Sequence, residues 1–210
     1  SWSSLLTRPV GNAKASADEL AEVLADLKLY KEEHPEMFEH KKISLLIHSM
    51  GHVVLREFTE KHYTHDLNDV NGKPLFDNYI SVAADVGLTD HKAWLSTIDF
   101  AARKYVLMNN RDLMLLLSYL LDLKAKMPFF YKLGLGLDKI PEKKRAKYVD
   151  SQTTYIDLSR SLKSDHRYFE SSEPLMLNLF APLLKGEEFL PKNVVGAKVK
   201  REDNVFYVID

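Results

Sequence analysis

The sequence predicts an all-α fold, a bundle of about seven helices followed by a short C-terminal β-hairpin. Three observations favour this fold. Apolar residues recur three and four positions apart through most of the chain, the spacing of one helix face. Apolar residues make up 45% and charged residues 28% of the 210 residues, which suits a soluble protein with a substantial core. Only residues 194–210 change to the pattern of two short strands.

The N-terminal part of the chain indicates two long helices. The first fifteen residues have no regular pattern, and we expect an irregular segment there. Ser16 and Glu19 have the spacing of a capping box, so a helix is expected to begin at Ser16. The second helix is expected over residues 35–62. Because its apolar residues occupy two faces, it is predicted to lie at the centre of the bundle.

Further helices and the hairpin complete the expected domain. The apolar run 113–121 is shorter than the roughly 20 residues of a membrane span, so we expect a buried helix and no transmembrane segment. No repeat or linker divides residues 1–210, which indicates a single domain. The remaining helices are expected over 77–86, 90–108, 111–126, 141–162 and 173–185, and the strands of the hairpin over 197–201 and 205–209.

Composition excludes several classes of function. The net charge of −1 gives no overall attraction to nucleic acid. Cysteine is absent, which removes disulfides, thiolate metal sites and cysteine nucleophiles. We find no phosphate-binding glycine loop, no dinucleotide motif and no Gly-x-Ser-x-Gly motif. The chain begins with Ser1, which fits a trimmed chain or a mature form after loss of a leader, in the cytoplasm or exported.

Histidines are the most informative residues for a metal site. His48 and His52 are four positions apart on the expected central helix, where their rings share one face and can bind zinc, iron or manganese. His91 or His166 would supply a third ligand. Ser49 stands where a zincin would have its catalytic glutamate, so that motif is incomplete. The alternative is that these histidines only form hydrogen bonds between helices.

Two other metal patterns are weaker. The His65-Asp66 pair, with His62 nearby and an upstream histidine such as His40, resembles the dyad of metal-dependent phosphohydrolases, but the residues before it are polar. Histidines at a helix C-terminus explain the same residues without a metal. A calcium loop over 69–78 fails, because Leu67 and Asn78 fall where carboxylate ligands are required.

A candidate partner surface combines an aromatic segment with a basic cluster. The aromatic residues are Phe129, Phe130 and Tyr131, and the basic residues include Lys143, Lys144 and Arg145. Together they could contact an acidic protein partner or lipid headgroups at a membrane surface. The alternative is a solvated helix face beside a buried loop.

Two functional hypotheses follow. The first is a non-enzymatic binding protein that recognises a protein partner through the apolar segment 127–137, the basic cluster and the hairpin edge. The second is a metal-dependent helical enzyme, a hydrolase or an oxidase, with a histidine-bound divalent transition metal. The sequence leaves the substrate, the identity of the partner and the oligomeric state open.

Overall fold

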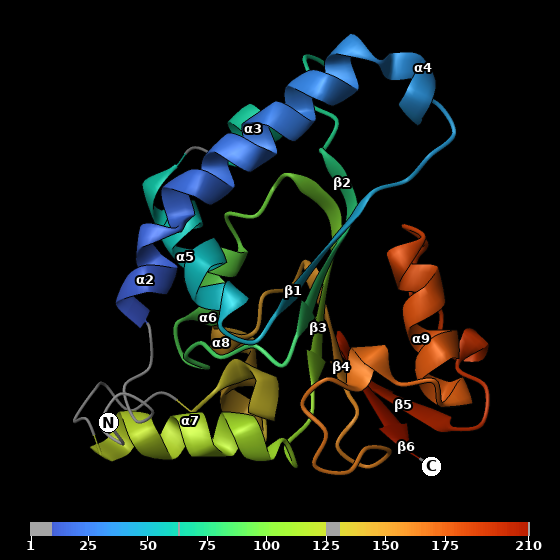
Figure 1. Cartoon of the computed structure of the whole chain (residues 1–210). Coiled ribbons are helices and arrows are strands. Elements are labelled where there is room, and N and C mark those ends of the chain that lie inside the picture. The colour runs from blue at the N-terminus through green and yellow to red at the C-terminus, as the bar shows by residue number, and fades with distance from the viewer. Residues whose placement is uncertain (1–9, 63, 125–130, 210) are drawn as a thin grey trace.

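The computed structural model describes residues 10–62, 64–124 and 131–209, and it shows an α/β architecture (Figure 1). The six strands of this part of the chain form one sheet in the order β1-β2-β3-β4-β6-β5. The strands are β1 (Ser44–His48), β2 (Phe76–Val82), β3 (Ala101–Met108), β4 (Thr153–Asp157), β5 (Lys198–Glu202) and β6 (Val205–Ile209).

Most strands of the sheet are parallel. Each of the pairs β1–β2, β2–β3, β3–β4 and β4–β6 is parallel, and only β5 runs antiparallel, to β6. The segments that follow β1, β2, β3 and β4 therefore leave the sheet at the same edge, where open α/β sheets place their ligand sites. The helices are α2 (Val10–Ala15), α3 (Ala17–Glu33), α4 (Pro35–Phe38), α5 (Gly51–Lys61), α6 (His91–Leu95), α7 (Leu113–Lys124), α8 (Arg145–Tyr148) and α9 (Pro174–Leu184).

Helices cover both faces of the sheet. Figure 1 shows α2, α3 and α5 on one side and α9 on the other. Side chains alternate between the two faces along each strand, so the protein has two apolar cores. In β2, Tyr79 joins the core that includes Phe58 of α5, whereas Ile80 joins the core that includes Leu179 and Phe180 of α9.

The predicted all-α bundle is wrong, and its expected central helix shows why. Residues 35–62 contain α4, β1 and α5 instead of one helix. Strand β1 has the sequence Ser-Leu-Leu-Ile-His and belongs to a parallel sheet. Such strands are continuous apolar runs, and a run of this kind satisfies the spacing of a helix face as well as that of a buried strand.

The same ambiguity affects three other expected helices. Segment 77–86 is mostly β2, segment 90–108 contains α6 and β3, and segment 141–162 contains α8 and β4. The expected helices in α3, α7 and α9 and the expected hairpin strands are confirmed. The hairpin, however, is the edge of the central sheet, because β6 pairs with β4.

Two local predictions near helix ends also differ from the structure. Residues 10–15 form α2 rather than an irregular segment. Ser16 precedes α3, but its hydroxyl donates a hydrogen bond to the carbonyl of Asn12 at 3.2 Å, so no capping box forms. The preceding helix supplies this acceptor, and the hydroxyl therefore turns back towards it.

The sequence predicts a buried helix over residues 113–121, but α7 is largely exposed. Within α7 only Leu115 is buried, whereas five apolar side chains face solvent: Leu113, Met114, Leu116, Leu117 and Leu120. In the part of the chain that the structure describes, no helix combines the length and apolar character needed to cross a membrane.

Candidate active site

A sharp turn joins β1 to α5, and Ser49 occupies it. Ser49 has a φ of 51°, a left-handed conformation that residues other than glycine seldom adopt. Its N–H donates to the carbonyl of Val82 at 3.1 Å, which extends the β1–β2 pairing into the turn. A Cβ at Gly51 would lie 3.2 Å from the side chain of Ile47, so any other residue there would press on Ile47 where the helix starts close to the strand. This strand–turn–helix arrangement is that of a nucleophile elbow.

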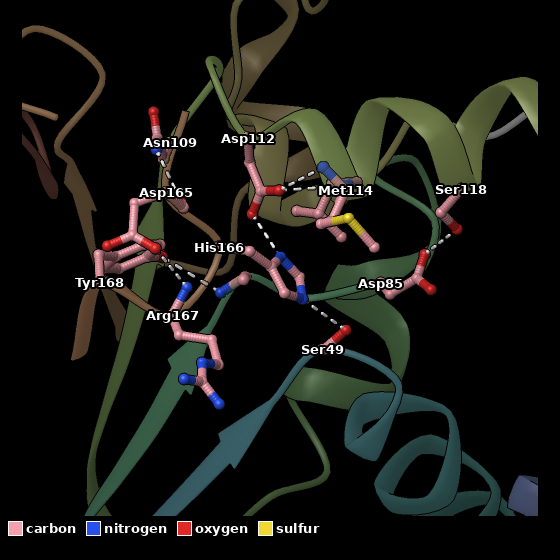
Figure 2. Close-up of polar contacts among 12 residues, drawn as sticks. Ser49, Asp85, Asn109, Asp112, Met114, Ser118, Asp165, His166, Arg167 and Tyr168 are labelled. Atoms are coloured by element: carbon pink, nitrogen blue, oxygen red, sulfur yellow. Dashed lines mark hydrogen bonds and ion pairs between the residues drawn. The ribbon is translucent and has the colours of Figure 1, made fainter. Parts of the chain in front are cut away.

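Ser49 lies at one end of a hydrogen-bonded chain of three side chains (Figure 2). Its Oγ is 3.0 Å from Nε2 of His166, and Nδ1 of the same ring is 2.7 Å from Oδ2 of Asp112. Because the carboxylate can only accept, Nδ1–H of His166 donates to it, and Nε2 is left to accept the Ser49 hydroxyl proton. Nucleophile, base and orienting acid therefore have the mutual geometry of a catalytic triad.

The start of α7 fixes the Asp112 carboxylate. Oδ1 of Asp112 accepts the N–H groups of Met114 and Leu115, each at 3.0 Å, which leaves Oδ2 for His166. Asp112 is completely buried. A negative charge at this position is stabilised by the unpaired amides and the dipole of the helix N-terminus.

Parallel strands bring the three residues together. Ser49 directly follows β1, Asp112 lies four residues after β3, and His166 lies in the segment after β4. Their order along the chain is serine, acid, histidine, which is the order found in α/β-hydrolases. All three therefore lie at the carboxyl edge of the sheet, where this architecture places its ligand sites.

His52, in the first turn of α5, is hydrogen-bonded to the backbone of the turn at Ser49. Its Nδ1–H donates to the carbonyl of Ser49 at 2.9 Å, and its Nε2 accepts the hydroxyl of Ser81 at 2.7 Å. The ring is fully buried, and this burial lowers the pKa of His52 to about 4. His52 is therefore neutral at pH 7, with its only ring proton used to hold the nucleophile's backbone.

This burial predicts a pH dependence of stability. As the pH falls below about 6.5, His52 of the unfolded chain binds a proton, whereas the folded chain binds it only near pH 4. The native state binds fewer protons across this interval, so its stability falls as the pH is lowered. We expect the wild-type protein to lose about 2 kcal/mol more stability than His52→Asn between pH 7 and pH 5, measured by urea unfolding. Equal losses in the two proteins would contradict this assignment.

A buried ion cluster connects the serine turn to α7. The backbone N–H of Asp85 donates to the carbonyl of Ser49 at 3.3 Å, and its carboxylate accepts the hydroxyl of Ser118 of α7 at 2.8 Å. The ammonium of Lys132 lies 3.1 Å from the Asp85 carboxylate and also pairs with Asp122 of α7. Figure 2 shows Asp85 and Ser118 beside the triad. Helix α7, which orients Asp112, is thus connected by these contacts to the loop at Asp85, whose backbone is hydrogen-bonded to Ser49.

The four histidines predicted as metal ligands lie in different environments. His48 is the last residue of β1 and not part of a helix, so it does not share a helix face with His52. The rings of His48 and His166 are close, with 4.6 Å between centroids. His91 is bonded to the carbonyl of Leu88 and, at 2.8 Å, to the hydroxyl of Tyr155. Among residues 10–62, 64–124 and 131–209, no group of three or more histidines and carboxylates has the geometry to hold a metal ion.

The predicted partner surface is only partly described. Phe129 and Phe130 lie outside the described residues. Tyr131 is half-buried and packs edge-on against Tyr119, with 5.8 Å between ring centroids. Lys143 and Lys144 are exposed.

The other parts of that surface are engaged within the fold. Arg145 donates to the hydroxyl of Tyr207 of β6 at 2.8 Å. In residues 131–137, the described part of the apolar segment 127–137, the leucines belong to the two cores and are not exposed for a partner.

Sequence reasoning missed Ser49 and Asp112 as functional residues. The signal for Ser49 is the segment Ile47-His48-Ser49-Met50-Gly51, which matches Gly-x-Ser-x-Gly at the serine and at the last glycine. Ile47 replaces the first glycine, so a search for the full motif fails. Asp112 has no comparable local signal, because its role depends on its contact with a residue 54 positions away.

Comparison with known proteins agrees with this geometry. No curated protein and no solved structure matches the chain. A family profile matches residues 9–182, which is more than half of the chain. The chain therefore belongs to the family described as "Alpha/beta hydrolase of unknown function (DUF900)".

Proposed function

We propose that this protein is a serine hydrolase that cleaves carboxylic esters through a covalent acyl-enzyme on Ser49. The observation that carries the proposal is the continuous chain from Ser49 through His166 to Asp112, anchored on a turn with a positive φ. Backbone strain of this kind is concentrated at functional sites. Membership in a hydrolase family and the parallel sheet contradict both sequence-based hypotheses, the non-enzymatic helical binding protein and the metal-dependent helical enzyme.

The acylation step uses all three triad residues. Ser49 Oγ attacks the ester carbonyl carbon while Nε2 of His166 takes the hydroxyl proton, giving a tetrahedral intermediate and an imidazolium. The Asp112 carboxylate stabilises this imidazolium and holds the ring in the required tautomer. The carbon–oxygen bond to the alcohol then breaks, and the imidazolium gives its proton to the departing alcohol.

The turn also offers a donor for the developing oxyanion. Met50 is the N-cap residue of α5, where helix geometry leaves N–H groups without an intrahelical acceptor. In nucleophile elbows, the N–H of the residue after the nucleophile donates to the oxyanion. We assign this role to the N–H of Met50, where the helix dipole adds to the stabilisation.

Deacylation repeats the chemistry with water. His166 takes a proton from a water molecule, which attacks the acyl carbon, and the acid is released as Ser49 regains its proton from the imidazolium. Esters are the expected class because an alcohol leaves more readily than an amine and needs less help from the general acid.

An ester panel tests the proposal. We expect p-nitrophenyl acetate, butyrate and octanoate to be hydrolysed, with an initial burst of nitrophenol equal to the enzyme concentration if deacylation limits the rate. Activity should persist in EDTA and in the control variant Ser96→Ala, which removes a hydroxyl that only bonds its own helix. Turnover of no ester above the level of Ser49→Ala would contradict the proposal.

A further inference from the structure

The segment that carries His166 has no regular structure at the histidine, so its position depends on side-chain contacts. The catalytic ring precedes the short 3-10 helix η4 (Tyr168–Glu170). Side chains at the ends of β1 and β3 donate hydrogen bonds to three main-chain carbonyls of this segment, those of Lys163, Asp165 and His166. These bonds come from only two residues, Asn109 and His48.

Asn109 connects the segment that carries His166 to the turn that carries Asp112. Its Nδ2 donates to the carbonyls of Lys163 at 2.9 Å and Asp165 at 3.2 Å. Its Oδ1 accepts the N–H of Arg111 at 3.1 Å, and its carbonyl accepts the N–H of Asp112 at 3.2 Å. Asn109 is completely buried, and both the NH₂ group and the oxygen of its side-chain amide are hydrogen-bonded. Figure 2 shows Asn109 reaching the backbone at Asp165, beside Asp112.

His48, the residue before Ser49, is hydrogen-bonded to the backbone of His166. Its Nε2–H donates to the carbonyl of His166 at 3.0 Å, and its ring packs against the rings of His166 and Phe169, with centroids 4.6 Å and 4.9 Å apart. His48 directly precedes Ser49 in the chain, so one dipeptide contacts His166 at both its backbone and its ring.

The charge on His48 is consistent with this contact. Partial burial lowers the pKa of His48, which keeps the ring neutral near pH 7. Against burial, the hydrogen bond to the carbonyl of His166 raises the pKa of His48; the charge on the His166 ring lowers it, and the carboxylates of Asp112 and Glu170 raise it. A neutral His48 avoids a second positive charge beside the imidazolium that His166 forms during catalysis.

We propose that Asn109 and His48 are positioning residues that set the distance and direction between Nε2 of His166 and Oγ of Ser49 through the backbone of segment 163–166. This inference rests on the proposed serine hydrolase function. Proton transfer requires close alignment, and a displacement of 1 Å can cost about 100-fold in rate. Loss of either donor should therefore slow proton transfer while leaving the binding of the ester largely unchanged.

Paired variants at His48 test the proposal. His48→Phe keeps a ring of similar shape without a donor, whereas His48→Gln offers an amide N–H near the position of Nε2. We expect kcat for p-nitrophenyl butyrate to fall about 10- to 100-fold in His48→Phe, with KM changed less than twofold, and to recover to within about threefold in His48→Gln. Rates are divided by the concentration of sites titrated with a fluorophosphonate, so that unfolded protein does not count.

Asn109→Ala provides the second arm, with the neighbouring Asn110→Ala as its control. Asn110 is exposed, and its side-chain Nδ2 donates to the carboxylate of Asp138 at 3.0 Å. We expect the per-site kcat to fall about 10- to 100-fold in Asn109→Ala and to be unchanged in Asn110→Ala.

The outcomes separate this inference from the function on which it rests. Wild-type protein that neither hydrolyses the ester nor reacts with the fluorophosphonate would overturn the proposed function. If the wild-type protein is active and His48→Phe has the same per-site kcat, the role of His48 is overturned and the proposed function stands. Equal losses of kcat in His48→Phe and His48→Gln would have the same meaning. An Asn109→Ala protein with wild-type per-site kcat would overturn the role of Asn109.

Discussion

Replacing Ser49 with alanine is expected to lower kcat for ester hydrolysis by about 10⁵- to 10⁶-fold, the size of effect seen when a triad nucleophile is removed. The reason is chemical, because no other hydroxyl is placed 3.0 Å from Nε2 of His166 in the described structure. The measurement is a steady-state assay with a p-nitrophenyl ester, corrected for the uncatalysed rate. A Ser49→Ala protein with more than one hundredth of wild-type kcat would contradict the role of Ser49.

The left-handed backbone at position 49 also predicts a difference in stability between two equally inactive variants. Ser49→Gly should be as inactive as Ser49→Ala, yet more stable than it by about 1 kcal/mol, because glycine adopts a φ of 51° without strain. Ser96, with a φ of −69°, is the control site, and there the alanine variant should be the more stable of the two. Urea unfolding of the four variants measures both differences. A Ser49→Ala protein more stable than Ser49→Gly would show that the turn holds no strain.

Asp112→Asn is expected to lower kcat by about 10⁴-fold. The amides of Met114 and Leu115 require an acceptor at Oδ1, so the NH₂ group of the new asparagine must point towards His166. It can donate only to an unprotonated Nδ1, which forces the ring proton onto Nε2, where it blocks transfer from Ser49.

This variant should fold normally, because asparagine is as good an N-cap residue as aspartate. We therefore expect the loss of kcat to be accompanied by a small change in the urea midpoint. Asp138→Asn, which changes an exposed carboxylate, serves as the control and should keep wild-type kcat. A loss below tenfold in Asp112→Asn would show that the acid does not set the tautomer of His166.

Sequence patterns predicted the parts of the fold that are locally determined. The Leu-rich α7, helix α9 before Gly186 and the β5–β6 hairpin each carry a local signal in period or in flanking residues. Strands β1 to β3 do not, because a strand buried on both faces has no polar alternation to distinguish it from a buried helix. Their identity depends on pairing with strands more than 20 residues away.

The candidate site was less predictable than the fold. The sequence predicts His166 as a metal ligand, but its partners, Ser49 and Asp112, lie 117 and 54 residues away and meet it only through the sheet. The spacing of His48 and His52 predicts one shared helix face, but His48 lies in β1 and His52 in α5, and each ring donates a hydrogen bond to a backbone carbonyl of the site. The histidines therefore mark the region of the site in the sequence, but the role of each one depends on which residues the parallel sheet brings together.

The most direct test of the central claim is mass spectrometry of the protein after treatment with a fluorophosphonate. A hydroxyl activated by His166 attacks phosphorus and displaces fluoride, leaving a stable adduct on the serine. We predict one adduct per chain, located on the peptide that contains Ser49, and no adduct in Ser49→Ala. An unmodified Ser49, or an adduct that persists in Ser49→Ala, would contradict the assignment of Ser49 as the nucleophile.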